Sequence, residues 1–377
     1  MRPIVIAIPA RNEEYAISAS LPALIAEAAS YAGDVSIVIA ANNCTDDTVS
    51  ISTAIAQTTT IPVHIAVMNL SARHANAGTA RARTLALAAA NACSSDTIIV
   101  TTDADTRPQP GWLAKISMAV NAGADAIAGS VDFEPSEAAK IRMPPIRQRE
   151  AEYAGLQAEL AALLDPNPHD PYPNHIWAWG ANLAVTLDAY RKTGGVPEVP
   201  LAEDRAFVSR LLEVDCKVLH SLDIRVWTSP RTKGRAPGGV ADLISIYATD
   251  PDYPCDAALL PVKDIFRQAS LQRQYRAAYQ GEPEAPLTRL AARLRLSLEE
   301  LDNALRQPFC GLGWANLVRN SPTLKAHRIY PVGLVREIRL AHRALALLGS
   351  PKTEGAKAFT YDNLWAGFAM DTNGQSR

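Results

Sequence analysis

The sequence lacks long apolar runs and is poor in cysteine. No stretch among the 377 residues approaches the ~20 apolar residues needed to cross a bilayer. The five cysteines are scattered and none forms a Cys-x-x-Cys pair, which argues against a zinc site and a disulfide framework. The apolar run at residues 4–9 is followed at once by charged residues and is too short for a signal peptide. We therefore expect a cytoplasmic protein without a transmembrane segment, and leave peripheral membrane contact open.

A large charge excess of one sign is also missing. The chain has 37 Lys and Arg residues against 39 Asp and Glu residues, a net charge of -2. Nucleic-acid binding requires a basic excess or a basic stripe, so we expect no nucleic-acid partner. A small phosphorylated ligand needs only a few arginines and is compatible with this balance. Apolar residues make up 48% of the chain, enough to bury a sizeable core.

Short apolar runs alternate with Ala-rich, helix-favouring segments over the first hundred residues. This repeat predicts a parallel sheet wrapped by helices, which binds ligands at the carboxyl ends of its strands. Asn12 is expected to cap the first helix. The expected strands are 3–8, 34–40, 62–68 and 97–102, and the expected helices are 15–32, 47–57 and 78–93.

The pattern changes after Gly129. A helix is expected around 147–164, followed by a Pro- and Trp-rich loop, and strands near 217–219 and 224–227. From about residue 241 the chain is mostly helical, as in 287–305 and 332–348. We expect one domain over 1–240, made of two halves that meet at about residue 130. A helical C-terminal region over 241–349 and a loosely ordered tail over 350–377 complete the expected organisation.

Two aspartates directly follow the fourth expected strand. Asp103 and Asp105 are two residues apart, so at a strand end their side chains point to the same side. Two carboxylates so placed can hold one divalent cation, which neutralises a bound diphosphate. The same triplet also occurs in solvated acidic turns, but its position at a strand end favours a metal site.

Several segments resemble the family 2 glycosyltransferases of the GT-A fold, in the nucleotide-diphospho-sugar transferase superfamily. The resemblance runs in the right order over roughly residues 1–240. It implies a donor half at about 1–130 and an acceptor half at about 131–240. It includes residues 8–14 (IPARNEE), 41–48 (ANNCTDDT) and 76–81 (NAGTAR). Asn42 falls where the family more often has an aspartate that contacts the nucleobase, which leaves the preferred base open. The donor-binding residues that the resemblance implies are Pro9, Arg11, Glu13, Asn42, Gly78, Arg81, Asp103 and Asp105, and for Arg81 a plain solvated helix position stays open.

An acidic pair, Glu203 and Asp204, matches the pair that opens a helix beside the acceptor in that family. The resemblance implies that Asp204 is the general base and that Glu203 positions a neighbour or the acceptor. An acceptor hydroxyl is a poor nucleophile, and a carboxylate within hydrogen-bond reach removes its proton as the sugar carbon is attacked. Two acids in a first helical turn are also common in any helix.

Three further groups have two interpretations each. Arg231 and Arg235, in a glycine-flanked basic loop, either grip the donor diphosphate or lie in an exposed turn. Trp177 and Trp179 either line the acceptor or donor-sugar pocket or pack in the core, and an extended segment would put both on one face. His220 is either an additional metal ligand or structural.

We therefore expect an α/β protein of GT-A fold, Rossmann-like with a mostly parallel central sheet flanked by helices, and a helical C-terminal extension. The expected activity is that of a hexosyltransferase-like enzyme that uses Mn²⁺ or Mg²⁺. It moves a sugar from a UDP-, GDP- or dTDP-linked donor to a small-molecule or glycan acceptor, with inversion, although retaining relatives share the fold. The alternatives are a catalytically silent nucleotide-sugar-binding protein and a sugar nucleotidyltransferase. The latter would show a Gly-rich loop with a lysine where this chain has PARNEE.

Overall fold

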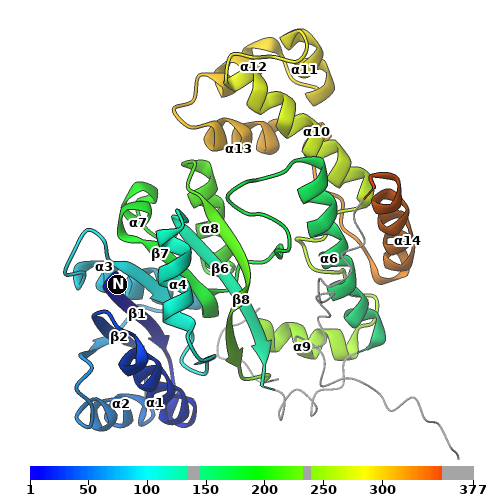
Figure 1. Ribbon diagram of the computed structural model, residues 1–377. Coiled ribbons are helices and arrows are strands. Elements are labelled where there is room, and N and C mark those ends of the chain that lie inside the picture. Colours follow the sequence, from blue (N-terminus) through cyan, green and yellow to red (C-terminus); the bar gives the residue numbers. More distant parts are fainter. Residues whose placement is uncertain (135–143, 232–238, 350–377) are drawn as a thin grey trace, which may run out of the picture.

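One mixed β-sheet forms the centre of the molecule (Figure 1). The structure is a computed structural model, and it describes residues 1–134, 144–231 and 239–349. Within them the strand order is β3-β2-β1-β4-β7-β6-β8-β5. The pairs β1–β2, β1–β4, β2–β3 and β6–β8 are parallel, and the remaining pairs are antiparallel. The strands are β1 (Ile4–Ala10), β2 (Val35–Asn42), β3 (Val63–Met68), β4 (Ile98–Thr101), β5 (Arg107–Pro108), β6 (Ala126–Phe133), β7 (Leu183–Thr186) and β8 (Val218–Thr228).

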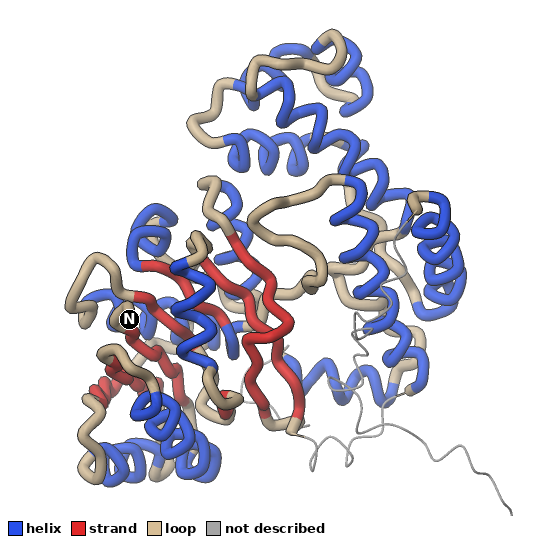
Figure 2. Tube along the Cα trace, in the orientation of Figure 1, coloured by secondary structure: helices blue, strands red, loops and turns tan. Residues whose placement is uncertain are grey.

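Helices cover both faces of this sheet (Figure 2). The alternation of side chains along β1 explains the division, because Ile4, Ile6 and Ile8 join one core and Val5 and Ala7 join the other. Helices α1 (Glu14–Ser30), α2 (Thr48–Ala56) and α4 (Trp112–Asn121) pack on the isoleucine face, and α3 (Ala77–Ala90), α7 (Leu187–Thr193) and α8 (Glu203–Glu213) on the other.

The remaining helices build a second body beside the sheet. Helix α6 packs against α10 and α14 around one apolar core, and α10 to α13 enclose another. None of the described helices is both long and apolar enough to cross a membrane. The helices are α6 (Pro145–Leu164), α9 (Val240–Thr249), α10 (Val262–Tyr279), α11 (Leu287–Leu294), α12 (Leu298–Leu305), α13 (Cys310–Asn320) and α14 (Pro331–Leu347).

The first four expected strands and the three helices between them are confirmed, with small differences at their ends. The two strands expected near 217–219 and 224–227 are one strand, β8, which has a register shift opposite Gly129. The sequence did not predict β6 or β7. The expectation that Asn12 caps the first helix is wrong: its φ is 54°, and its Oδ1 accepts a hydrogen bond from the Thr45 N–H instead. The expected tail, 350–377, lies outside the described residues.

Candidate functional site

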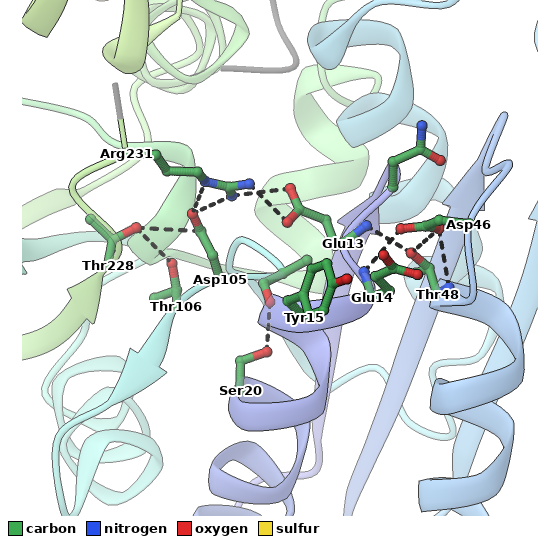
Figure 3. A network of polar contacts seen from close by, with 12 residues as sticks. Glu13, Glu14, Tyr15, Ser20, Asp46, Thr48, Asp105, Thr106, Thr228 and Arg231 are labelled. Carbon is green, nitrogen blue, oxygen red and sulfur yellow. Dashed lines mark hydrogen bonds and ion pairs between the residues drawn. The ribbon is translucent and has the colours of Figure 1, made fainter. Parts of the chain in front are cut away.

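Carboxylates gather at the carboxyl ends of β1 and β4. Glu13 follows β1, and Asp103 and Asp105 follow β4, the parallel neighbour of β1. The carboxyl end of β8 brings Thr228 and Arg231 to the same place (Figure 3). The ends of β1, β4 and β8, which are distant in the sequence, therefore form one acidic site.

Arg231 lies between two of these carboxylates (Figure 3). Its Nε donates to Asp105 Oδ2 at 3.0 Å, its Nη1 to Glu13 Oε2 at 2.9 Å and its Nη2 to Glu13 Oε1 at 3.0 Å. Burial, together with the Asp103 and Glu13 carboxylates, raises the pKa of Asp105 to about 6, although Arg231 acts in the opposite direction. Arg231 therefore contacts protein carboxylates at the site, and its role in gripping a diphosphate stays a prediction. Arg235 lies outside the described residues.

The turn that carries Glu13 is held by residues at the start of α2 (Figure 3). The Glu13 N–H donates to Thr48 Oγ1 at 2.7 Å, and the Glu14 N–H to Asp46 Oδ2 at 3.1 Å. On the other side, Ser20 Oγ donates to the Ala104 carbonyl, at the centre of the aspartate triplet, at 2.6 Å. Helix α1 therefore connects the turn after β1 with the turn after β4.

Arg81 joins the aspartate triplet to the acidic pair of α8. Its Nη2 donates to Asp103 Oδ1 at 2.6 Å and its Nε to Glu203 Oε1 at 2.8 Å. Its Nη1 donates to both Thr101 Oγ1 and the Gly180 carbonyl at 2.9 Å. Arg81 is 8% exposed, so its guanidinium lies beneath the site and is directed at protein acceptors. This differs from both the solvated and the diphosphate-facing interpretation of the sequence.

Asp204 is held close to this network by Gly180. The Gly180 N–H donates to Asp204 Oδ2 at 3.0 Å, while the Gly180 carbonyl accepts from Arg81. A Cβ at Gly180 would lie 2.5 Å from Arg81 Nε, so a larger residue there would displace the Arg81 guanidinium. Burial and the neighbouring Glu203 raise the pKa of Asp204, although Arg81 and two backbone N–H groups act in the opposite direction. The structure therefore brings the expected base and Asp103 together through two shared residues.

Asn182, which sequence reasoning did not single out, fastens the same turn. Its Oδ1 accepts from Trp112 Nε1 at 2.9 Å, and its Nδ2 donates to the carbonyls of Ser130 at 2.8 Å and Ile224 at 2.9 Å. It thus ties α4, β6 and β8 to the turn that contains Gly180. Its place two residues after Gly180, in the short turn that precedes β7, was the available signal.

The expected nucleobase residue, Asn42, ends β2 and is 2% exposed. Its Oδ1 is buried and has no hydrogen-bond partner within the part of the chain that the structure describes. A buried polar atom without a partner is costly, and a ligand group would satisfy it.

Two other expected donor-binding residues lie on or just after β1. Pro9 is half-buried on β1, and Arg11 is exposed, with Nη1 donating to the Ala75 carbonyl at 3.1 Å.

Gly78 has a packing role that sequence reasoning did not foresee. A Cβ at this position would collide with the carbonyl oxygen of Val199, so the absent side chain lets α3 approach the segment that precedes α8. Asn76 caps α3 by accepting from the Thr79 N–H at 2.8 Å. A role of Gly78 in donor binding stays a prediction.

The two tryptophans lie together, as an extended segment predicts. The ring centroids of Trp177 and Trp179 are 5.2 Å apart. Trp177 is buried in the core shared with α6 and α14, whereas Trp179 is half-buried between that core and the core of the sheet. The structure thus favours the packing interpretation for Trp177 and leaves part of Trp179 accessible.

His220 is held away from the aspartate triplet. Its Nδ1 pairs with Asp170 Oδ2 at 2.8 Å, and its backbone N–H donates to Asp170 Oδ1 at 2.8 Å. It lies near the start of β8, whereas Thr228 at the end of β8 contacts Asp105, a separation on the order of 25 Å along an extended strand. The interpretation of His220 as a ligand of the same metal is therefore wrong.

The carboxylate pair fits a hard cation only in part. No group of three or more His, Cys, Asp or Glu side chains within the described ranges could hold a metal. Asp103 is 37% exposed at its side chain, and only its Oδ1 accepts from described residues, so Oδ2 is available to a cation. Asp105 can contribute once Arg231 moves aside. Because Mg²⁺ and Mn²⁺ prefer oxygen ligands and share them with phosphates, diphosphate oxygens would complete the coordination.

Two hollows lie along α6, and neither lining includes the carboxylates of the site. One of about 430 Å³ lies along α8 and α6, and its lining includes Ala178, Arg205 and His220. The other, of about 580 Å³, lies between α6 and α10 and is lined by Gln157, Gln268 and Gln272 among others. Neither lining includes Trp177 or Trp179.

Comparison with known proteins found one matching family model and similar solved structures. Residues 5–173 match the family model described as Glycosyl transferase family 2. No relative was found among curated proteins. Among solved structures, the chain is similar to the mannosyltransferase PcManGT from Pyrobaculum calidifontis in complex with GDP-Man and Mn²⁺, with 15% identity, 97% of this chain and 84% of that chain covered, and a TM-score of 0.45. It is also similar to S. aureus TarS 1-349 in complex with UDP-GlcNAc, with 12% identity, 98% and 89% covered, and a TM-score of 0.45.

Proposed function

Because the chain belongs to glycosyl transferase family 2 through residues 5–173, we propose that this nucleotide-sugar transferase depends on a divalent metal and on Asp204 as its base. The observation that carries the proposal is the network around Arg81. One buried guanidinium donates to Asp103 and Glu203, and it also donates to the Gly180 carbonyl, whose residue holds Asp204 through its N–H. Such a network would fix the position of Asp103, beside the leaving group, relative to Asp204, beside the acceptor.

Asp103 and Asp105 are the proposed metal ligands. When bound, Mn²⁺ or Mg²⁺ stabilises the negative charge that develops on the departing nucleoside diphosphate. Arg231 would leave Asp105 and donate to the diphosphate oxygens, for which its fork geometry is suited. Once Arg231 has moved, the Glu13 carboxylate would be available to accept hydrogen bonds from the donor.

Asp204 would accept the proton of the acceptor hydroxyl. The hydroxyl oxygen forms a bond to the anomeric carbon while the bond from that carbon to the diphosphate breaks, and the proton passes to the Asp204 carboxylate. A raised pKa makes that carboxylate a better proton acceptor than an ordinary aspartate near neutral pH. Glu203, bonded to Arg81, positions α8 rather than reacting. This single displacement inverts the anomeric centre.

The donor and acceptor follow from the remaining groups. The unpaired Oδ1 of Asn42 supports contact with a nucleobase, and UDP-, GDP- and dTDP-linked donors all offer N–H groups to it. Trp179 is half-buried, and its exposed part supports contact with a sugar ring beside Gly180, which is compatible with a small-molecule or a glycan acceptor. A hexosyl donor is the proposed class.

A donor panel tests the function. The protein is incubated with UDP-, GDP- and dTDP-sugars and Mn²⁺, and released nucleoside diphosphate is measured over time. We expect one nucleotide class to give release above background hydrolysis, and Asn42→Asp to change the ranking of the classes more than the maximal rate. Tight donor binding without release for every donor would instead support the catalytically silent binding protein.

A further inference from the structure

The near-neutral net charge conceals two oppositely charged parts. Residues 262–349, which contain α10 to α14, carry fourteen Lys and Arg against seven Asp and Glu, a net charge of +7. Residues 1–261 carry twenty against twenty-nine, a net charge of -9. The basic part does not contain the proposed catalytic residues. Its charge therefore calls for a separate explanation.

Helix α14 concentrates this charge on one side. Positions 332, 336, 339, 343 and 347 recur every three or four residues and lie on one face of the helix. The opposite face buries Leu334, Ile338, Ala341 and Leu345 against α6 and its neighbours, so the first face points to solvent at the edge of the molecule (Figure 1). The first face, named here the arginine face, consists of Val332, Arg336, Arg339, Arg343 and Leu347.

The arginine face has free cations and exposed apolar ends. Arg336, Arg339 and Arg343 are exposed, and none has a hydrogen bond or ion pair with the residues that the structure describes. Val332 is 90% exposed and Leu347 is 89% exposed. Two acids on α14 and α6 are engaged with other groups: Glu337 accepts from the Val262 N–H at 2.8 Å, and Glu152 lies 3.7 Å from His342.

We propose that the arginine face of α14 binds the surface of a bilayer that contains anionic phospholipids. Guanidinium groups pair with lipid phosphates, and the apolar side chains at both ends of the face enter the headgroup boundary. A nucleic-acid duplex would satisfy the arginines but would leave Val332 and Leu347 exposed. The overall charge separation orients the chain, because the -9 part is repelled from the surface that attracts the +7 part.

Vesicle flotation of the full chain tests this surface. Vesicles of phosphatidylcholine with and without phosphatidylglycerol are compared, each at low and high salt. We expect binding only with phosphatidylglycerol and weaker binding at high salt, because salt screens surface charge. The triple variant Arg336→Gln, Arg339→Gln, Arg343→Gln should weaken binding by about a hundredfold. Val332→Ser with Leu347→Ser should weaken it further at fixed charge.

A matched variant separates the arginine face from general charge attraction. Arg289, Arg293 and Arg295, on or next to α11, are exposed and lie at another end of the molecule (Figure 1). Changing these three to Gln removes the same charge and should leave most vesicle binding intact. Equal losses in the two triple variants, no binding of the unmodified chain to anionic vesicles, or equally tight binding to duplex DNA would each overturn the proposal. The assay needs no sugar donor, so it stands or falls independently of the proposed catalysis.

Discussion

At the scale of single residues, the acids of the site were predictable and their partners were not. Asp103 and Asp105 could be found because a strand pattern ends just before them, and Glu203 and Asp204 because a family motif surrounds them. The pairing of Arg81 with Glu203 joins positions 122 residues apart in sequence. No local pattern reports such a contact, so Arg81 was expected at the donor and is instead buried between the two acidic groups.

Replacing the expected base tests its role directly. Asp204→Asn should lower kcat by roughly 10²–10⁴-fold, the usual contribution of general-base assistance. Donor affinity should persist, because the proposed metal and diphosphate contacts belong to Asp103, Asp105 and Arg231. A donor titration beside a turnover assay measures both. Asp188→Asn, an exposed acid in the first turn of α7, is the control. A joint loss of affinity and turnover would assign Asp204 to the donor site instead.

The pH profile follows from the environment of the same carboxylate. Burial and Glu203 raise the pKa of Asp204 above its ordinary value of 3.8. The base must be unprotonated, so kcat should fall as pH drops through this raised pKa. The acid limb of the profile should therefore have its midpoint above 3.8, and the residual activity of Asp204→Asn should lack that limb. A limb unchanged in the variant would identify another titrating group.

Arg81 should matter for stability as well as for geometry. Arg81→Met leaves Glu203 buried without its ion-pair partner, and removal of one member of a buried pair costs about 3–5 kcal/mol. Denaturant unfolding measures the loss. Arg83 lies two residues further along α3, in an exposed ion pair with Glu198. Arg83→Met should therefore cost no more than about 1 kcal/mol. Similar losses for both variants would show that the Arg81 network adds little.

At the scale of elements, segments with a periodic sequence pattern were predicted well. Strands that depend on contacts with distant segments were not. The first four strands are apolar runs bounded by turn residues, a pattern that is visible without any partner. Strand β6 contains Gly129, which reads as a break in sequence. In the structure a Cβ there would lie 2.6 Å from Asn182 Cγ, so the glycine permits a close approach within a continuous strand. Strand β7 is short and exists through its antiparallel pairing with β4 and β6.

The packing of α3 yields a prediction at this scale. Gly78→Ala places a methyl group against the backbone carbonyl of Val199, and forced overpacking costs typically about 1–3 kcal/mol. Gly333→Ala is the matched control, because a Cβ at that position of α14 meets open space. In a helix it should be neutral or stabilise by about 0.4–1 kcal/mol. Thermal unfolding of the two variants compares them, and a harmless Gly78→Ala would argue against the close approach of α3.

At the scale of the whole molecule, the GT-A fold and the helical extension were predicted, while the arrangement of the extension was not. The family resemblance stopped at about residue 240, and the composition beyond it indicated helices only. In the structure, α6 of the expected acceptor half shares a core with α14. The charge separation between the two parts was hidden by the net value of -2, because a sum over the chain cancels opposite regional charges.

The central claim is that sugar transfer requires a divalent metal held at Asp103 and Asp105. In the structure Arg231 supplies the positive charge at Asp105, and the proposal requires it to leave when metal and donor bind. The most direct measurement is nucleoside diphosphate release by the unmodified chain before and after excess EDTA, followed by re-addition of Mn²⁺. The account predicts loss of release in EDTA and recovery with Mn²⁺, and no recovery for Asp105→Ala. Full turnover in excess EDTA would contradict it.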